Sequence, residues 1–158
     1  MNLTFHSPVL ITKDLEILRN FYEKVLQLEV ELDFGACIIF KDGFSLWQLN
    51  EDLQIAKKLG YTHHQQGNKN LELSFETENF NDVLTTLEVH APKLLHETHE
   101  EDWGQRTIRF FDPEDNLIEI GESIPAFVRR LHAEGLNIDD VAEKTGVPKE
   151  LVLQYLKK

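Results

Sequence analysis

The chain has few of the residues that would point to several common classes of protein. It contains a single cysteine, Cys37, which excludes an internal disulfide and any metal site built from several cysteines. No apolar run approaches the roughly 18 residues of a membrane span. The first residues also lack the basic start and apolar core of a secretory signal. We therefore expect a cytoplasmic protein with no membrane partner.

Basic residues are also scarce, with 16 Lys and Arg against 28 Asp and Glu, which gives a net charge of −12. Surfaces that bind nucleic acid or anionic membranes need clustered Lys and Arg, so the composition argues against both partners. The chain has 158 residues, of which 41% are hydrophobic and 28% charged, as expected for one globular domain with a proper core. A small molecule is the partner that this composition favours.

The pattern of apolar residues repeats once along the chain. Residues 3–12 read as a strand, and Asp14 is a plausible N-cap for an amphipathic helix. Three short strands are then expected, at residues 28–34, 36–40 and 44–49. The second half repeats the order, with Asn79 as the helix cap and strands expected at residues 71–77, 93–98, 106–111 and 116–120. Each half is therefore predicted to be β-α-β-β-β, and an internal duplication is a strong clue to the fold.

Two such halves predict an α+β fold in which each helix covers one face of a curved mixed sheet and leaves the other face free to form a cavity. Strand alternation places Gln48, Glu72 and Glu119 on the free face. On the same argument Trp47 faces the core. Cys37, among apolar neighbours, is interpreted as a buried strand thiol.

Two motifs near the end of the repeat are similar to a known superfamily. WGQR at residues 103–106 and DPEDNLIEI at residues 112–120 resemble the end of a vicinal-oxygen-chelate module, as found in glyoxalases, bleomycin-resistance proteins and extradiol dioxygenases. The resemblance covers about residues 3–122. It implies a domain at residues 1–123, made of two βαβββ modules at about residues 3–50 and 70–122, and it implies a homodimer.

The resemblance also implies where a metal would bind. Members of the superfamily carry metal ligands on the first, fourth, fifth and eighth strands, which here match Ser7, Gln48, Glu72 and Glu119. None of these supplies the imidazole or thiolate that Zn²⁺, Ni²⁺ and Fe²⁺ favour. A bulge at Pro8 would bring His6 onto the cavity face. The candidate ligands of a divalent metal are therefore His6, Gln48, Glu72 and Glu119, and a strand-end role for His6 with no metal is the alternative.

Glu119 and Glu72 are also the candidate catalytic residues. Two carboxylates facing one partly dry cavity raise each other's pKa, which is how proteins make a general acid or base near neutrality. The alternative is that they pair with Arg106, with Arg109 or with hydroxyl groups of a ligand, and do no chemistry.

Other residues are candidates for binding a ligand. Trp103, Gln105 and Arg106 precede a strand, and the resemblance places their loop at the mouth of the cavity, where Trp103 would stack on a flat or cationic ligand. Packing of Trp103 on a neighbouring subunit is the alternative. Tyr61 lies in the long connection at residues 50–70, which is typical of a functional lid. The adjacent pair His63 and His64 suits a metal poorly, because neighbouring side chains point apart.

Residues 124–158 form a predicted helical tail that the resemblance does not cover. Helices are expected at residues 126–134, from Asn137 through Val141, and at residues 149–156, and the last two are similar to a helix-turn-helix half. The tail holds six Lys and Arg against five Asp and Glu, which is poorly suited to phosphate contacts. We expect it to dock on the body of the protein or on a dimer mate.

Three functions are compatible with these observations. The first is an enzyme of lyase or dioxygenase type with a degenerate metal site, acting on a small organic molecule in the cavity. The second is a non-catalytic protein that binds and sequesters a drug or metabolite. The third is a ligand-sensing regulator, against which the charge of the tail counts.

Overall fold

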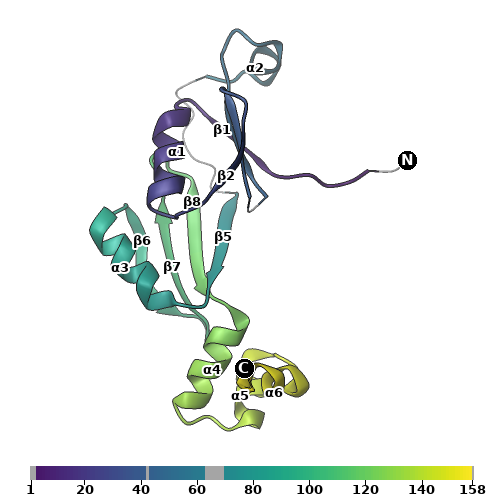
Figure 1. Cartoon of the computed structure of the whole chain (residues 1–158), viewed down its shortest axis with the longest axis vertical. Coiled ribbons are helices and arrows are strands. Elements are labelled where there is room, and N and C mark those ends of the chain that lie inside the picture. Colours follow the sequence, from purple (N-terminus) through teal and green to yellow (C-terminus); the bar gives the residue numbers. More distant parts are fainter. Residues whose placement is uncertain (1–2, 42, 63–69, 158) are drawn as a thin grey trace. The chain divides into compact units, whose positions relative to one another are not determined.

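The computed structural model describes residues 3–41, 43–62 and 70–157 of the chain (Figure 1). It divides into two compact units, the first comprising residues 1–68 and 112–116 and the second residues 69–111 and 117–158. The described part contains six helices and two four-stranded mixed sheets, one in each unit. This confirms the predicted α+β class, the two βαβββ modules and the C-terminal helical extension. No helix among the described residues is long and apolar enough to cross a membrane.

The first unit begins with a strand that is shorter than predicted. Strand β1 starts at Val9 instead of residue 3, just after Pro8, which has no N–H to donate to a ladder but accepts from Ser45 N at 3.1 Å. Strand β1 is Val9–Thr12. The elements that follow it are α1 (Leu15–Lys24), β2 (Val30–Asp33), β3 (Cys37–Phe40), β4 (Ser45–Gln48) and α2 (Gln54–Leu59). The strand order is β1-β4-β3-β2, with β1 and β4 parallel and the other pairs antiparallel.

Helix α1 is fixed at its start by Asp14, whose side chain accepts from Ile17 N at 3.1 Å, as an N-cap should. Its apolar stripe buries Tyr22 against the rings of Phe40 and Phe44, with centroid distances of 5.8 and 5.1 Å. The Tyr22 hydroxyl donates to Asp112 Oδ2 at 3.0 Å within the same unit, and burial raises the pKa of Tyr22. Each ring buried in this way stabilises the unit by roughly 1.5–3 kcal/mol.

The second unit repeats this order of elements. They are β5 (Glu72–Thr77), α3 (Phe80–His90), β6 (Leu94–Glu100), β7 (Arg106–Phe111) and β8 (Leu117–Glu122). The strand order β5-β8-β7-β6, with β5 and β8 parallel, is that of the first sheet. Asn79 occupies the predicted cap position of α3, but its side chain makes no capping hydrogen bond and contacts Asp82 instead.

The predicted tail consists of α4 (Ile124–Ala133), α5 (Ile138–Thr145) and α6 (Lys149–Leu156). Asn137 caps α5 by accepting from the backbone N–H groups of Asp139 and Asp140, at 2.9 and 3.1 Å. The three helices share a small core of Phe127, Val128, Leu131, Val141 and Val152. They belong to the second unit, where Arg130 of α4 pairs with Glu122 of β8.

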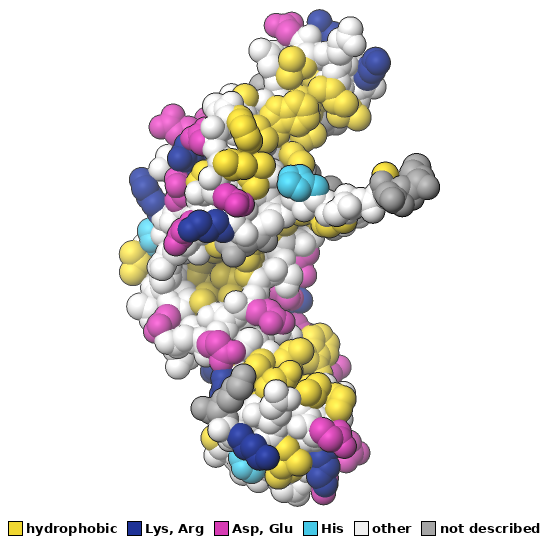
Figure 2. All heavy atoms as spheres, turned by 45° about the vertical axis from the view of Figure 1, so that its right-hand side comes forward, with side chains coloured by type: hydrophobic (Ala, Val, Ile, Leu, Met, Phe, Trp, Pro, Cys, Tyr) yellow, Lys and Arg dark blue, Asp and Glu magenta, His cyan; other side chains and the backbone are white. Residues whose placement is uncertain are grey.

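The uncovered face of the first sheet is apolar. Trp47 lies opposite Cys37 and Ile11 in the sheet, and all three are half-buried, so the predicted core position of Trp47 and the predicted burial of Cys37 are wrong. Val9 and Leu32 on the same sheet are 48% and 47% exposed. Figure 2 shows hydrophobic side chains gathered over this part of the first unit. Such a patch is a common feature of protein interfaces.

Candidate functional site

The uncovered face of the second sheet is charged. In β7 and β8, Ile108, Phe110, Ile118 and Ile120 are buried on the side that α3 covers. Because successive strand side chains point to opposite faces, Arg109 and Glu119 lie on the other side, directly opposite each other in the β7–β8 register. Glu119 also accepts from the Ser74 hydroxyl of β5 at 3.0 Å. This is the free face on which alternation predicted Glu72 and Glu119.

Arg109 joins three carboxylates on this face. Its Nε donates to Glu72 at 2.9 Å, Nη1 donates to Glu101 at 2.9 Å, and Nη2 donates to Glu119. The Glu101 and Glu119 side chains are only 14% and 13% exposed. We call these four residues the Arg109 cluster. One guanidinium against three carboxylates leaves two negative charges in excess, with spare acceptor oxygens and few spare donors.

These contacts bear on the two sequence interpretations of the carboxylates. Hydrogen bonding to Arg109 is the main cause that lowers the pKa of Glu101. Burial opposes the charge of Arg109, but hydrogen bonds to Glu101 and Glu72 outweigh it and raise the pKa of Arg109. The acid–base hypothesis depends on Glu72 and Glu119 repelling each other. A cation bonded to both offsets that repulsion, so the arrangement agrees with the paired alternative and identifies Arg109 as the partner.

Arg106, the other proposed partner, lies on the opposite face of the sheet. Its guanidinium stands 5.2 Å from the centroid of the Phe80 ring in α3, and its Nη2 donates to Glu122 at 2.6 Å. Alternation along β7 separates Arg106 from Arg109. Arg106 therefore pairs with the nearly buried Glu122 and not with Glu72 or Glu119, while its contact with a ligand stays a prediction.

Trp103 lies in the loop before β7, two residues after Glu101 of the Arg109 cluster in the sequence. Trp103 is 44% exposed and its Nε1 donates to Gln105 Oε1 at 3.0 Å, while Gln105 Nε2 donates to Glu122 O at 2.7 Å. Gly104 has φ +90°, and its carbonyl accepts from Arg130 Nη2 at 2.5 Å. The amide of Gln105 is thus held by the loop and by β8, while the indole ring of Trp103 stays accessible.

Gln48 does not occupy the position that the sequence predicted. Thr12 and Thr77 each accept from the backbone N–H two residues later, and Thr12 pairs with Gln48 as Thr77 pairs with Glu122. The counterpart of Gln48 in the second unit is therefore Glu122, not Glu119. Gln48 Oε1 accepts from Leu15 N at 3.3 Å, at the start of α1, so the side chain points toward the helix side of the sheet.

The same register makes Ser45 the counterpart of Glu119, since Ser45 pairs with Val9 as Glu119 pairs with Ser74. Ser45 Oγ lies 3.3 Å from Ser7 Oγ. The four strand positions that would carry metal ligands thus hold two hydroxyls, which are weak ligands, and two carboxylates that are already bonded to Arg109. His6 is exposed, and no group of three or more His, Cys, Asp and Glu that could hold a metal occurs in the part of the chain that the structure describes. This donor set does not fit a transition metal.

Tyr61 lies in the first unit after α2 and is half-buried. Its backbone N–H donates to Ala56 O at 2.9 Å. Burial and the nearby carboxylates of Glu114 and Glu51 raise the pKa of Tyr61, so its hydroxyl stays protonated. His63 and His64 lie outside the described residues.

Sequence reasoning did not find Glu101 or the role of Arg130. Glu101 follows β6, whose pairing with β7 shifts register twice, so alternation counted from the middle of that strand does not reach it. Arg130 lies in the tail that the resemblance does not cover. In both cases the residue carries a charge opposite to that of its partner, which is Arg109 for Glu101 and Glu122 for Arg130.

Comparison with known proteins gives a family for most of the chain. The model of the glyoxalase-like domain matches residues 5–125. Among solved structures, a protein of unknown function from Agrobacterium tumefaciens is 28% identical, with a TM-score of 0.68, covering 78% of this chain and 97% of its own. A lactoylglutathione lyase from the same organism is 22% identical, with a TM-score of 0.55 and coverage of 76% and 93%.

A genomically encoded fosfomycin resistance protein from Listeria monocytogenes is 15% identical, with a TM-score of 0.53 and coverage of 78% and 95%. At these low identities, the similarity of the lyase and of the resistance protein to this chain shows a common fold and no more. Among curated proteins, none matches it.

Proposed function

Since the chain belongs to the glyoxalase-like domain family, we propose that it is a small-molecule-binding member whose ligand contacts the Arg109 cluster without a metal. The observation that carries the proposal is the set of three hydrogen bonds from Arg109 to Glu72, Glu101 and Glu119. They give the open face of the second sheet a fixed arrangement of partly exposed carboxylates. Such an arrangement is suited to recognition, because its geometry is set before the ligand arrives.

The charge of the cluster selects the class of ligand. Each of the three nitrogens of the Arg109 guanidinium already donates to a carboxylate, so a ligand anion would find few donors and a net negative field. A ligand that carries an ammonium group, or several hydroxyl or amide donors, would meet free acceptor oxygens. The exposed indole ring of Trp103 adds a surface on which a flat or cationic ligand stacks.

The proposal is tested with two probes of opposite charge and the same ring, tryptamine and indole-3-acetate. Protein labelled with ¹⁵N is titrated while the side-chain signals of Arg109 Nε and Trp103 Nε1 are followed. We expect tryptamine to shift both signals and indole-3-acetate to shift neither. Equal response to both probes, or no response of the Arg109 signal to tryptamine, would overturn the proposal.

Variants then locate the binding. Glu119→Gln removes one carboxylate of the cluster and is expected to weaken tryptamine binding about tenfold, equivalent to roughly 1.4 kcal/mol. Glu143→Gln on α5 removes the same charge from an exposed position in the tail and is the matched control. A loss of affinity that is equal in both variants would mean that tryptamine responds only to the overall charge of −12.

Turnover by Glu119 and Glu72, as a lyase or a dioxygenase-type enzyme, stays a second prediction. The contact of Glu119 with the Ser74 hydroxyl favours it, because a ligand that displaced Arg109 would leave a largely buried carboxylate with a polar neighbour. Its test is Glu119→Gln in an assay of any identified substrate, and unchanged turnover would remove it. A ligand-sensing regulator would need salt-dependent DNA affinity. Absence of that affinity at low salt would dispose of the regulator.

A further inference from the structure

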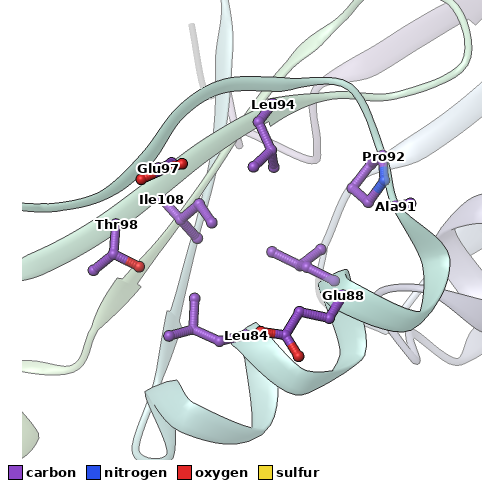
Figure 3. Close-up of a pocket in the computed structure, with 9 residues that line it drawn as sticks. Leu84, Glu88, Ala91, Pro92, Leu94, Glu97, Thr98 and Ile108 are labelled. Carbon is purple, nitrogen blue, oxygen red and sulfur yellow. The ribbon is translucent and has the colours of Figure 1, made fainter.

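A cavity lies on the helix-covered side of the second sheet, between α3 and strands β6 and β7. Its volume is about 500 Å³, within the range of sites for small ligands. Figure 3 shows Leu84 from α3, Leu94 from β6 and Ile108 from β7 pointing into one space, with Ala91 and Pro92 at one end. Ile108, at 4% exposed, forms the floor. We call this space the α3 cavity.

One residue that lines the cavity is smaller than its counterpart in the first unit. Tyr22 and Leu87 follow the N-caps of α1 and α3 by the same number of residues, and both are buried. By the strand register, Phe44 likewise corresponds to Ile118. In the first unit the two rings pack against each other, with centroids 5.1 Å apart. Leu87 lines the cavity and is smaller than Tyr22, so it leaves room beside α3 that the Tyr22 ring fills beside α1.

A bulge turns two polar side chains toward this cavity. In the β6–β7 ladder His96 pairs with Arg109 and His99 pairs with Thr107, so Glu97 and Thr98 together stand opposite the single residue Ile108. Such a bulge redirects side chains out of the normal alternation. Glu97 and Thr98 therefore line the cavity together with Glu88 from α3.

We propose that the α3 cavity binds a small amphipathic amine, with its alkyl chain on Leu84, Leu94 and Ile108 and its ammonium group toward Glu88 and Glu97. The floor and walls are apolar, and among the described residues that line the cavity the only charged ones are the two glutamates, with no Lys, Arg or His. An alkyl chain buries apolar area, and an ammonium group complements both carboxylates. A fatty acid with an alkyl chain of the same length as that of the amine would bring its carboxylate close to the like charges of Glu88 and Glu97.

This site is separate from the Arg109 cluster. Ile108 and Arg109 are consecutive residues of β7, so their side chains point to opposite faces of the sheet. The α3 cavity proposal does not depend on the proposed function, and the two are distinguished by variants on either face.

The test uses three probes with the same chain and different heads, octylammonium, octanoate and 1-octanol. The methyl signals of Ile108, Leu84 and Leu94 are followed by ¹H–¹³C NMR during each titration. We expect octylammonium to shift these signals with an affinity about tenfold above octanol, and octanoate to bind more weakly than octanol. The same affinity for octylammonium and octanoate would overturn the charge assignment, and no methyl shift with any probe would overturn the site.

Variants check the location of the probe. Leu84→Trp fills the cavity and should abolish the response, while a dispersed amide spectrum verifies that this variant folds. The surface pair Glu88→Gln and Glu97→Gln leaves the apolar walls intact and should lower octylammonium affinity about tenfold without changing octanol affinity. The pair Glu143→Gln and Glu150→Gln removes the same two charges from exposed positions of α5 and α6, is the matched control, and should leave octylammonium affinity at Ile108 unchanged. A loss in the Glu143 and Glu150 pair equal to that in the Glu88 and Glu97 pair would contradict the proposal.

Discussion

Glu122→Gln removes the carboxylate that joins the helical tail to the second sheet. Glu122 lies at the end of β8, is 2% exposed, and accepts from Arg106 Nε at 3.0 Å and Arg130 Nη2 at 3.0 Å. It also accepts from the backbone N–H of Arg106 at 3.0 Å. Glutamine has the same shape but no charge, so the two guanidinium groups lose their shared counter-charge.

The size of the effect follows from the burial of the partners. The Arg130 side chain is 15% exposed and the Arg106 side chain is 30% exposed, so water replaces the lost carboxylate only in part. Breaking a buried ion pair by removing one partner costs roughly 3–5 kcal/mol. Arg130 keeps contacts with Glu134 and Glu100, which reduces the loss. We expect Glu122→Gln to lower the free energy of unfolding by about 2–4 kcal/mol.

The assay is urea unfolding followed by circular dichroism, with hydrogen exchange of α4 to α6 as a local readout. At a typical slope for a small protein, the midpoint should fall by about 1–2 M urea. Glu134→Gln is the matched control, since Glu134 also accepts from Arg130 but is 52% exposed, and it should cost less than about 0.5 kcal/mol. An unfolding free energy of Glu122→Gln within about 0.5 kcal/mol of the parent would refute the reasoning.

Three further predictions concern acid stability, the Trp103 loop and assembly. Burial opposes ionisation of Glu122, but hydrogen bonds from Arg130 and Arg106 outweigh it and hold its pKa below the usual 4.5. Its stabilising contribution is therefore complete above that pH and lost as the pH falls through the lowered folded-state value, and urea unfolding between about pH 3 and 7 should show a slope that Glu122→Gln flattens. Gly104→Ala should cost about 1–3 kcal/mol, because Gly104 has φ +90° and the added Cβ would lie 2.8 Å from Leu131 Cδ1; Gly35→Ala, with φ +78° and open space, measures the cost of the backbone alone. The apolar uncovered face of the first sheet and the family resemblance predict a homodimer, and a sedimentation coefficient of a monomer at micromolar concentration would contradict it.

Local signals in the sequence predicted most of the fold. Asp14 and Asn137 were identified as helix caps from their residue type and position alone, and both make the capping hydrogen bonds. The duplicated β-α-β-β-β order was also readable, because each strand and helix has its own period of apolar residues. The start of β1 was predicted too early, since apolar residues before Pro8 look like strand but make no ladder.

The candidate site was less predictable because it depends on register between strands. The sequence pattern placed Gln48 on the fourth strand where Glu119 stands on the eighth. The ladders match Gln48 with Glu122 instead. A one-dimensional pattern gives the alternation of a strand but not the neighbour that each residue meets.

Partners of charged residues show the same limit. The sequence left Arg106 and Arg109 as equal candidates for pairing with Glu119. Only the register of β7 against β8 places Arg109 opposite Glu119, and only the packing of α3 places Arg106 over Phe80. Long-range contacts of this kind require the tertiary structure.

The claim on which this account depends most is that Arg109, and not a divalent ion, neutralises Glu72 and Glu119. The direct measurement is the metal content of purified protein by elemental mass spectrometry, after incubation with Mn²⁺, Ni²⁺, Zn²⁺ or Fe²⁺ and removal of excess ion. We predict far less than one metal per chain under every condition, and the same low value for Glu119→Gln. Near-stoichiometric metal in the parent protein that is lost in Glu119→Gln would contradict this prediction.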